Sequence, residues 1–474
     1  MNFSQHYIDG SWVDSHSEAT IAVVNPATMR SFAEIPAGDS RDAAEAAEAA
    51  RRAFPAWKKT TLEERIALMT KWAEALTKRA ETIGELEVQE LGTPWEYSYK
   101  KHGLYQIGRI KAYCECAREM GFQGKLTGAY VRMEPVGVVS CITPWNYPLG
   151  QIIQKVIPAL LMGNTVVLKP SSQAPLSAFV LAEAADEAGI PMGVFNLISG
   201  SARSYGDSLI THPAFAMVSF TGSTAVGREI AAKAGAALKK VSLELGGKSP
   251  CIWLPGMPSY DDACRTLFKS VFLNAGQTCT AQSRLLIHES MTEMVKVVFQ
   301  RIIKEFPIGA PLREGAVIGP VVSRRQYEKV ADYIRSGVEE GAELFIGRVP
   351  EEDPISGFYI APTIFMNVAP GMRIAREEIF GPVLSVFTYR TEEEAVKLAN
   401  DTPYGLSSGV FGPEDAARRI ADEIDAGNVF VNNAPRDVKA PFGGFKASGL
   451  GYESGVAGLS EFVRWKSVFV HGGV

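Results

Sequence analysis

The stretch LNAGQTCTAQSR, residues 273–284, contains the side chain best suited to covalent chemistry, Cys279. Small polar residues surround it after an apolar segment, which indicates a loop or a helix start following a helix over 261–273. A cysteine near free backbone N–H groups at a helix N-terminus has a lowered pKa and acts as a nucleophile. The remaining five cysteines lie in apolar helices or strands and are interpreted as buried structural residues: Cys114, Cys116, Cys141, Cys251 and Cys264.

A carboxylate, Glu244, ends the otherwise apolar strand of LELGGKSP before two glycines. An unpaired buried carboxylate is costly, so Glu244 is either salt-bridged or functional. Burial would raise its pKa towards neutrality, as a general base requires. The GKS in this stretch resembles a phosphate-binding P-loop, but Ser242 stands where that motif needs glycine.

Three other strand ends carry polar groups. In FTGSTAVG (220–227), Gly222 and Ser223 either bind a pyrophosphate at a helix start or simply cap the helix. Lys169 ends the strand of NTVVLKP, where it would meet a ribose or phosphate. Asn146 of TPWNYP either donates to a developing oxyanion or serves only the turn. The Rossmann glycine spacing is absent from the chain.

Composition narrows the class of protein. The 474 residues predict two or three domains at about 150 residues each. With 46% hydrophobic and 21% charged residues, the chain is neither disordered nor fibrous. A net charge of -5 gives no electrostatic case for binding nucleic acid or an anionic membrane. Six cysteines form no disulfide framework, and no His cluster indicates a metal site.

Two observations predict a cytoplasmic location. The N-terminal MNFSQHYIDGSW lacks the basic and apolar regions of a signal peptide. The longest uncharged run, Pro135 to Gln154, contains three prolines and an asparagine, which favour strand, loop and helix start over a membrane span.

Strand and helix patterns alternate along most of the chain, which predicts parallel α/β sheets. The predicted strands are 136–142, 164–170, 193–199, 217–222, 251–254, 283–289 and 385–390. The predicted helices are 42–53, 62–91, 150–161, 176–188, 227–237 and 261–273, and Gly189 caps the fourth of these. The alternation restarts after 240–250, so we expect a second α/β domain from about residue 247.

Two segments fit neither sheet. Residues 124–135 read as a β-hairpin arm and 464–471 as a terminal strand. Because isolated β-ribbons are marginal in water, these segments pair with each other or with another subunit.

Together these stretches resemble the aldehyde dehydrogenase superfamily over essentially the full length. The matching motifs, in order, are YIDGSW, TPWNYP, VLKPS, FTGSTAVG, LELGGKSP, GQTC, EEIFGPV (377–383), YGLSSGVF (404–411) and PFGGFKASGLG (441–451). The resemblance implies an aldehyde-dehydrogenase-like α/β fold with two parallel-sheet domains and a β-arm for oligomerisation. It divides the chain into a cofactor domain (1–123 and 136–246), a catalytic domain (247–445), and an arm with a C-terminal strand (124–135 and 456–474).

The resemblance also implies catalytic roles. Cys279 would attack the aldehyde carbon, and Asn146 with the Cys279 backbone N–H would hold the oxyanion. After hydride transfer to a nicotinamide, Glu244 would activate the water that hydrolyses the thioester. Lys155 and Glu453 match positions associated with a proton route to Glu244.

By the same resemblance, a nicotinamide cofactor would be bound by Thr143, Pro144, Trp145, Lys169, Ser171, Ser172, Phe220, Gly222, Ser223, Gly246, Glu378 and Phe380. Many NAD-preferring relatives carry a glutamate three residues after the lysine matching Lys169. Here Ser172 occupies that place, so no carboxylate repels a 2′-phosphate, and we expect NADP to be accepted as well as NAD.

The resemblance also implies that the substrate is a small-molecule aldehyde. Its tunnel would be lined by Tyr147, Gln151, Gln154, Thr278, Thr280, Arg436 and Phe442. Succinate-semialdehyde enzymes often carry arginine where this chain has Gln154, which weakens that substrate. Arg436 either meets an anionic group or forms a surface salt bridge, and we favour the salt bridge.

Relatives are dimers or tetramers, so we expect a homo-oligomer. A coenzyme-A-acylating semialdehyde dehydrogenase is an alternative, but such enzymes usually lack the base glutamate. Because Glu244 is present, hydrolysis to the acid is favoured. A non-catalytic structural relative would lose part of this constellation, which is intact here. A nucleotide-hydrolysing enzyme is disfavoured because the P-loop match fails.

Overall fold

The computed structural model describes residues 3–121, 123–126 and 128–471. The ranges predicted above for the cofactor domain and the arm include positions 1–2, 122, 127 and 472–474, which lie outside the described residues.

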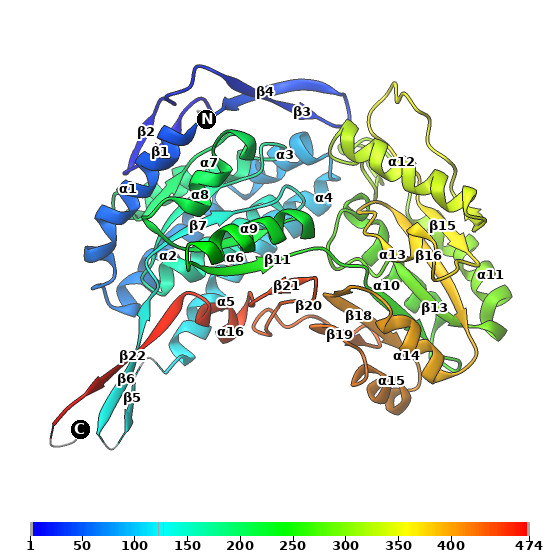
Figure 1. Ribbon diagram of the computed structural model, residues 1–474. Coiled ribbons are helices and arrows are strands. Elements are labelled where there is room, and N and C mark those ends of the chain that lie inside the picture. The colour runs from blue at the N-terminus through cyan, green and yellow to red at the C-terminus, as the bar shows by residue number, and fades with distance from the viewer. Residues whose placement is uncertain (1–2, 122, 127, 472–474) are drawn as a thin grey trace.

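An eight-stranded sheet forms mainly from the first half of the chain (Figure 1). Its strands, in spatial order, are β2 (Ser11–Val13), β1 (His6–Ile8), β9 (Phe195–Leu197), β8 (Thr165–Lys169), β7 (Val138–Ile142), β10 (Phe215–Thr221), β11 (Lys240–Glu244) and β21 (Gly449–Leu450). The neighbours from β9 to β11 are parallel, and the edges at β1 and β21 are antiparallel. Every residue of β8 is buried, as expected for a parallel strand covered on both faces.

The second sheet has seven strands. Their order is β14 (Glu343–Ile346), β15 (Thr363–Met366), β16 (Val383–Tyr389), β13 (Arg284–His288), β12 (Pro250–Trp253), β18 (Ser407–Phe411) and β19 (Asn428–Val431). Only β14 is antiparallel to its neighbour. Two parallel-sheet units, predicted from the alternating pattern, are therefore confirmed. Two small ribbons were not predicted: β3 (Thr20–Asn25) with β4 (Arg30–Pro36), and β17 (Tyr404–Gly405) with β20 (Phe445–Lys446).

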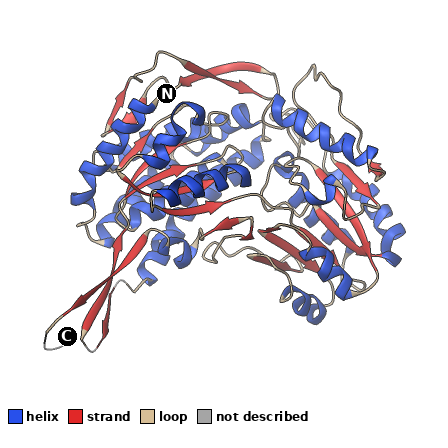
Figure 2. Cartoon of the chain, viewed as in Figure 1, coloured by secondary structure: helices blue, strands red, loops and turns tan. Residues whose placement is uncertain are grey.

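Helices flank both sheets (Figure 2). Those of the first half are α1 (Ser40–Trp57), α2 (Leu62–Thr77), α3 (Ala80–Leu91), α4 (Trp95–Tyr97), the π-helix η1 (Ser98–Leu104), α5 (Tyr105–Glu119), α6 (Pro148–Leu161), α7 (Leu176–Ala188), α8 (Ala202–Thr211) and α9 (Thr224–Ala236). Those of the second half are α10 (Tyr260–Phe272), α11 (Thr292–Ile302), α12 (Arg324–Glu339), α13 (Arg373–Arg376), α14 (Glu392–Asn400), α15 (Glu414–Ala421) and α16 (Gly455–Ser460), with short 3-10 turns η2 (Leu273–Gly276), η3 (Glu289–Met291) and η4 (Ile303–Glu305). Gly189 ends α7 with φ 76°, as predicted.

The single helix predicted over 62–91 is wrong. A turn at Lys78 and Arg79 separates α2 from α3, and each helix then buries its own apolar face. The helix α2 packs on α5 and α7, whereas α3 packs mainly on η1. Apolar periodicity continues across the break, so the sequence pattern does not reveal the change of direction.

The predicted arm is confirmed as a three-stranded ribbon that projects from the body (Figure 1). The central strand β6 (Ala129–Pro135) pairs antiparallel with both β5 (Gln123–Leu126) and β22 (Val463–Phe469). The two segments predicted from the sequence therefore pair with each other. Two aromatic side chains of β22, Trp465 and Phe469, are 63% and 81% exposed.

The two sheets have separate hydrophobic cores. One core is built mostly from residues between Tyr7 and Met217, and the other from residues between Cys251 and Ala426. The uncharged run at 135–154 forms β7, a loop and the start of α6. Within the described ranges, none of the helices has both the length and the apolar character needed to cross a membrane.

Candidate active site

A cavity of about 740 Å³ collects the loops predicted to do chemistry. Its walls come from the loop after β7, the carboxyl ends of β8, β10 and β11, and segments belonging to the second sheet. The lining residues include Pro144, Trp145, Asn146, Gln151, Lys169, Ser171, Ser172, Gly222, Ser223, Gly246, Cys279, Glu378 and Phe380, all of them predicted site residues. Parallel strands end at one edge of their sheet, which is why these separate segments meet.

Two residues predicted for the cofactor lie behind this wall. The ring of Phe220 lies under Gly222, where a Cβ would approach it to 2.3 Å. The backbone N–H of Thr143 donates to the carbonyl of Lys169 at 3.1 Å, so Thr143 joins two neighbouring strand ends.

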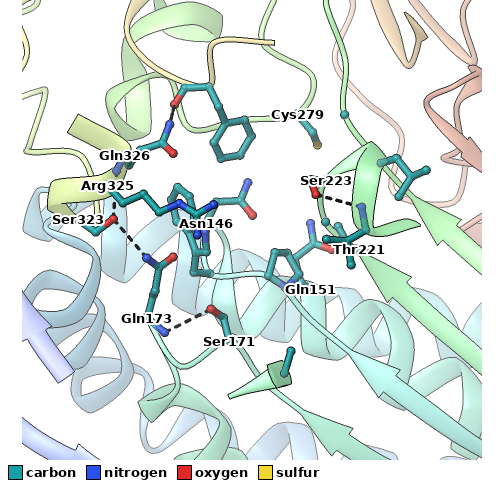
Figure 3. A pocket seen from close by; sticks show the side chains of 18 of the residues that line it. Asn146, Gln151, Ser171, Gln173, Thr221, Ser223, Cys279, Ser323, Arg325 and Gln326 are labelled. Atoms are coloured by element: carbon teal, nitrogen blue, oxygen red, sulfur yellow. Dashed lines mark hydrogen bonds between the residues drawn. The ribbon is translucent and has the colours of Figure 1, made fainter. Parts of the chain in front are cut away.

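Cys279 lies in a turn between η2 and β13, and its side chain faces the cavity (Figure 3). The turn follows three successive residues with left-handed backbone, Asn274, Ala275 and Gly276. At Gly276 a Cβ would lie 2.2 Å from the backbone of Gly381, so only glycine fits. No helix begins at Cys279, so of the two predicted alternatives the loop is confirmed and the helix start is not.

The predicted lowering of the Cys279 pKa is also wrong. Burial raises the pKa of the thiol to about 12, and the nearby carboxylates of Glu378 and Glu244 add to the effect. A thiolate is disfavoured where neighbouring charges are negative and water is scarce.

Asn146 is fixed to the segment that carries Cys279. Its Nδ2 donates to the carbonyl of Gln277 at 2.9 Å, and its own carbonyl accepts from Asn274 Nδ2 at 2.8 Å. Gln277 is itself anchored, because its Oε1 accepts from the backbone N–H of Val322 at 2.8 Å. Sequence reasoning missed Asn274 and Gln277 as positioning residues, although both lie in LNAGQTC.

Glu244 is the last residue of β11 and is 3% exposed. Neither carboxylate oxygen has a hydrogen-bond partner among the described residues. Burial raises its pKa well above the usual range, the charge of Glu453 raises it further, and Lys155 opposes both. This agrees with the direction expected from the sequence.

Lys155 and Glu453 form a buried ion pair, with Nζ 2.6 Å from Oε1. The second oxygen of Glu453 has no hydrogen-bond partner within the described part of the chain. Because this pair influences the pKa of Glu244, the three side chains form one electrostatic unit.

At the β8 side of the cavity, Lys169 is 5% exposed, and burial lowers its pKa to about 8. Ser223 caps α9, with its Oγ accepting from the Val226 N–H at 3.4 Å. The helix-capping alternative for Ser223 is therefore confirmed, and the residue still faces the cavity (Figure 3).

Glu378 and Phe380 lie on the opposite wall. Glu378 Oε1 accepts from the backbone N–H of Gly247 at 3.0 Å, and a Cβ on Gly246 would lie 2.4 Å from its other oxygen. Phe380 has φ 60°, and its ring meets that of Trp145 edge to face at 5.4 Å. Because Gly246 has no side chain, the space beside the Glu378 carboxylate stays open.

The predicted substrate residues do not share one cavity: Gln151 lines the large one, three others line a smaller one, and Tyr147, Gln154 and Thr278 line neither. The hydroxyls of Tyr147 and Thr278 lie 2.9 Å apart, and Tyr147 also stacks on His102 at 4.6 Å.

A smaller cavity of about 120 Å³ is lined by Thr280, Arg436 and Phe442 together with Ser270, Gln282, Ser407, Asn428 and Phe430. Arg436 is partly buried over the Phe442 ring, 4.3 Å from its centroid. No ion pair involves Arg436 among the described residues, so the favoured surface salt bridge is wrong. Gln154 Oε1 accepts from Arg109 Nη2 at 2.8 Å, a contact that the sequence did not predict.

Across the ranges that the structure describes, no group of three or more His, Cys, Asp or Glu side chains is arranged to hold a metal ion.

Comparisons with known proteins agree on one family. The model of the aldehyde dehydrogenase family matches residues 12–468. A mutant of aldehyde dehydrogenase C from Pseudomonas syringae, in complex with NAD+ and octanal, is 38% identical, with a TM-score of 0.96 over 98% of this chain and 96% of that one. Aldehyde dehydrogenase from Bartonella henselae is 40% identical, with a TM-score of 0.96 over 99% of both chains. An NADP-dependent enzyme of E. coli is 33% identical, with a TM-score of 0.95 over 99% and 98%.

The raised pKa of Cys279 predicts how the ligand-free protein reacts with iodoacetamide. Because only the thiolate reacts, the rate at Cys279 should rise about tenfold per pH unit through neutral and mildly alkaline pH. Quenched samples analysed by mass spectrometry would locate and time the label, and Cys279→Ala would give the background from the other cysteines. A rate that levels off near neutral pH would contradict a raised pKa.

Proposed function

The chain belongs to the aldehyde dehydrogenase family, and we propose that it oxidises an aldehyde to the carboxylic acid with NAD or NADP through a covalent intermediate on Cys279. One observation carries the proposal. The thiol of Cys279 and the amide of Asn146 line the same cavity, and the unpaired carboxylate of Glu244 is close enough to influence the thiol.

In the first step, the thiol of Cys279 gives its proton to solvent water, and its sulfur forms a bond to the aldehyde carbon while the C=O π electrons move to the carbonyl oxygen, which becomes an oxyanion. Asn146 has two amide hydrogens, and the one bonded to Gln277 leaves the other for this oxygen. The backbone N–H of Cys279 is the second proposed donor. Donors fixed before the reaction stabilise such an oxyanion most effectively.

When bound, the nicotinamide supplies a hydride acceptor, which oxidises the carbon attached to Cys279 to a thioester. Glu244 then takes a proton from water as the water oxygen attacks the thioester carbon. The C–S bond breaks, the acid is released, and the sulfur of Cys279 is free again. A pKa raised by burial suits Glu244 to this role as a base near neutral pH.

The ion pair of Lys155 and Glu453 is the proposed route by which the proton leaves Glu244. Support comes from the short Nζ–Oε1 contact and from the burial of both groups beside Glu244. The Oε2 of Glu453 has no hydrogen-bond partner among the described residues, so it can accept a proton. A proton that leaves Glu244 by this route does not have to cross the cavity.

The large cavity fits a dinucleotide. Lys169 is a buried cation with no carboxylate partner in the described chain, as suits a hydroxyl- or phosphate-bearing ligand. Ser223 lies at the N-terminus of a 13-residue helix, where backbone N–H groups favour a pyrophosphate. Gly246 keeps open the space beside Glu378 and Phe380, which we assign to the nicotinamide end.

We also propose that NADP is accepted. Ser172 lines the cavity beside Lys169 and Ser171, and the lining contains a single acidic residue, Glu378, on the opposite wall. A 2′-phosphate near Lys169 would therefore meet a cation and hydroxyls and no carboxylate.

Residues 1–123 and 136–246 are the proposed cofactor domain, and 247–445 the catalytic domain. Residues 124–135 and 456–474 are proposed to join subunits into a dimer or tetramer, supported by the exposed aromatic residues of β22 and by its unpaired edge. All six cysteines are free, which suits the reducing cytoplasm where we place the protein.

Replacement of the nucleophile tests the proposed reaction. Cys279→Ala should abolish aldehyde-dependent formation of NAD(P)H while cofactor binding, measured by fluorescence titration, persists. Cys114→Ala is the matched control, because that thiol is buried in α5 away from the cavity. Retention of substantial activity by Cys279→Ala would rule out the covalent route.

Replacement of the base tests the second half of the reaction. Glu244→Gln keeps the shape but accepts no proton, so one turnover of NAD(P)H should appear as a burst before steady turnover that is about 10²–10⁴-fold slower. Rapid-mixing absorbance would record the burst, and mass spectrometry of quenched protein would detect the acyl group on Cys279. Steady turnover equal to that of the native protein would assign the base to another residue.

Position 172 tests the choice of cofactor. The native protein should use NADP, and Ser172→Glu should lower kcat/KM for NADP relative to NAD by about tenfold or more, because like charges repel. Ser172→Ala, which removes the hydroxyl without adding charge, should shift the ratio far less. Negligible NADP activity in the native protein, or an unchanged ratio in Ser172→Glu, would exclude Ser172 as the selector.

A further inference from the structure

Arg109 on α5 is a buried cation whose hydrogen-bond partners are all neutral. The residue is 7% exposed, and its Nη2 donates to Gln154 Oε1 and to Ser454 Oγ, both at 2.8 Å. Its Nη1 lies 3.4 Å from Gln106 Oε1, and its Nε has no hydrogen-bond partner in the described chain. None of these contacts balances the charge.

Arg436 is a second cation in the same region. Its guanidinium lies over the Phe442 ring, and its Nη2 is buried without a hydrogen-bond partner among the described residues. Burial lowers the pKa of Arg436, and the positive charge of Arg109 lowers it further. The two guanidinium groups are therefore close enough to repel each other.

Such an arrangement is costly unless an anion completes it. Arginine is rarely buried without a paired carboxylate, because taking its charge out of water is unfavourable. Among the described residues, neither Arg109 nor Arg436 has an ion pair. A purely structural arginine would be expected to have its donors satisfied, which the unpaired Nη2 of Arg436 and Nε of Arg109 are not.

The position of these cations relates them to the substrate and not to the cofactor. Neither arginine lines the large cavity. Arg436 and Phe442 line the smaller cavity of about 120 Å³ together with Thr280, the residue next to Cys279. Burial raises the pKa of the Cys279 thiol, and the charge of Arg436 opposes that rise, so the guanidinium is within electrostatic reach of the sulfur.

We propose that the aldehyde substrate carries a carboxylate at its other end, and that Arg436, supported by Arg109, binds this carboxylate while Cys279 receives the aldehyde carbon. This inference rests on the proposed function and adds the substrate class. Guanidinium donors form a planar fork that matches two carboxylate oxygens, and the free Nη2 of Arg436 is one such donor. The carbon chain of the substrate would lie along the Phe442 ring.

Arg109 acts as a positioning residue in this arrangement. Its hydrogen bonds fix it to Gln154 and Ser454. These two residues are next to Lys155 and Glu453 in the sequence. Its charge makes the region attractive to an anion, whereas Arg436, which lines the smaller cavity, supplies the unpaired donor. The two arginines should therefore both matter for an anionic substrate, and Arg436 should matter more.

Turnover of two matched aldehydes tests the proposal. A short unbranched ω-carboxy aldehyde and its methyl ester have the same chain and differ in charge. The native protein should show a kcat/KM for the acid about tenfold or more above that for the ester, as expected for a charge-assisted hydrogen bond. Arg436→Gln should remove most of this preference, chiefly through KM for the acid, and Arg109→Gln should reduce it less.

The controls separate charge from packing. Arg436→Lys keeps the charge and should retain part of the preference, whereas Arg348→Gln removes an exposed arginine that lines neither cavity and should retain all of it. Thermal unfolding would show whether each variant is folded. If Arg436→Gln does not fold, Arg436→Lys and Arg109→Gln still give the comparison. A native protein that prefers the ester, or variants whose preference is unchanged, would overturn the assignment.

A binding experiment keeps this inference separate from the proposed reaction. Cys279→Ala protein, which cannot form the covalent intermediate, would be titrated calorimetrically with the ω-carboxy aldehyde and with the methyl ester. Tighter binding of the acid that is lost in Cys279→Ala/Arg436→Gln would support the anion site even if neither compound were oxidised. Equal affinities would overturn the inference even if both were oxidised.

Discussion

Two reciprocal hydrogen bonds join the halves of the candidate site. Asn146, from the loop after β7, donates to the carbonyl of Gln277, and Asn274 donates back to the carbonyl of Asn146. The first sheet thereby supplies the amide of Asn146 and the second supplies Cys279, and the two hydrogen bonds hold these segments against each other. Because all three residues are buried, water does not compete for these bonds, and the distance between amide and thiol is fixed before any ligand arrives. The left-handed turn before Cys279 belongs to the same arrangement, since Asn274, which donates to Asn146, is its first residue.

Charged side chains of both signs act on the thiol of Cys279 at this junction. The carboxylates of Glu244, Glu378 and Glu453 surround the thiol and disfavour the thiolate in the ligand-free protein. A cationic ligand group or an approaching arginine would reverse that balance, and the positively charged nicotinamide ring is such a group. Arg436 brings an opposing positive charge within reach of the sulfur. Arg109 lies close enough to repel Arg436, and neither arginine has an ion pair among the described residues. Cys279 therefore lies within electrostatic reach of buried carboxylates and of a partly buried guanidinium, Arg436, that has no ion pair among the described residues, and ligands of opposite charge would relieve the desolvation cost of these groups.

Several strands and helix ends of this protein could be predicted from local sequence patterns. The strands at β7, β8, β12 and β13 and the helix ended by Gly189 were predicted correctly, because buried parallel strands are continuous apolar runs and helix ends use glycine. Motif resemblance named Cys279, Asn146 and Glu244, and the structure places Cys279 and Asn146 on one cavity, with the Glu244 carboxylate unpaired behind its wall. The break between α2 and α3 was missed because apolar periodicity continues through it. The pKa of Cys279 was predicted in the wrong direction because the burial of the thiol, and its neighbours in space Glu378 and Glu244, follow from parts of the chain that are distant in the sequence.

The sequence by itself determined the fold class and the family and named the candidate reactive side chains, since these depend on residue type and short-range spacing. Only the tertiary structure decided their electrostatic surroundings. Position 154 is a neutral glutamine in the sequence, yet Arg109 from another helix lies 2.8 Å from it. Arg436 reads as a surface residue, yet it lies partly buried over Phe442 without an ion pair in the described chain. Coulombic and desolvation effects depend on distance and burial in three dimensions, and neither quantity is contained in the order of residues along one chain.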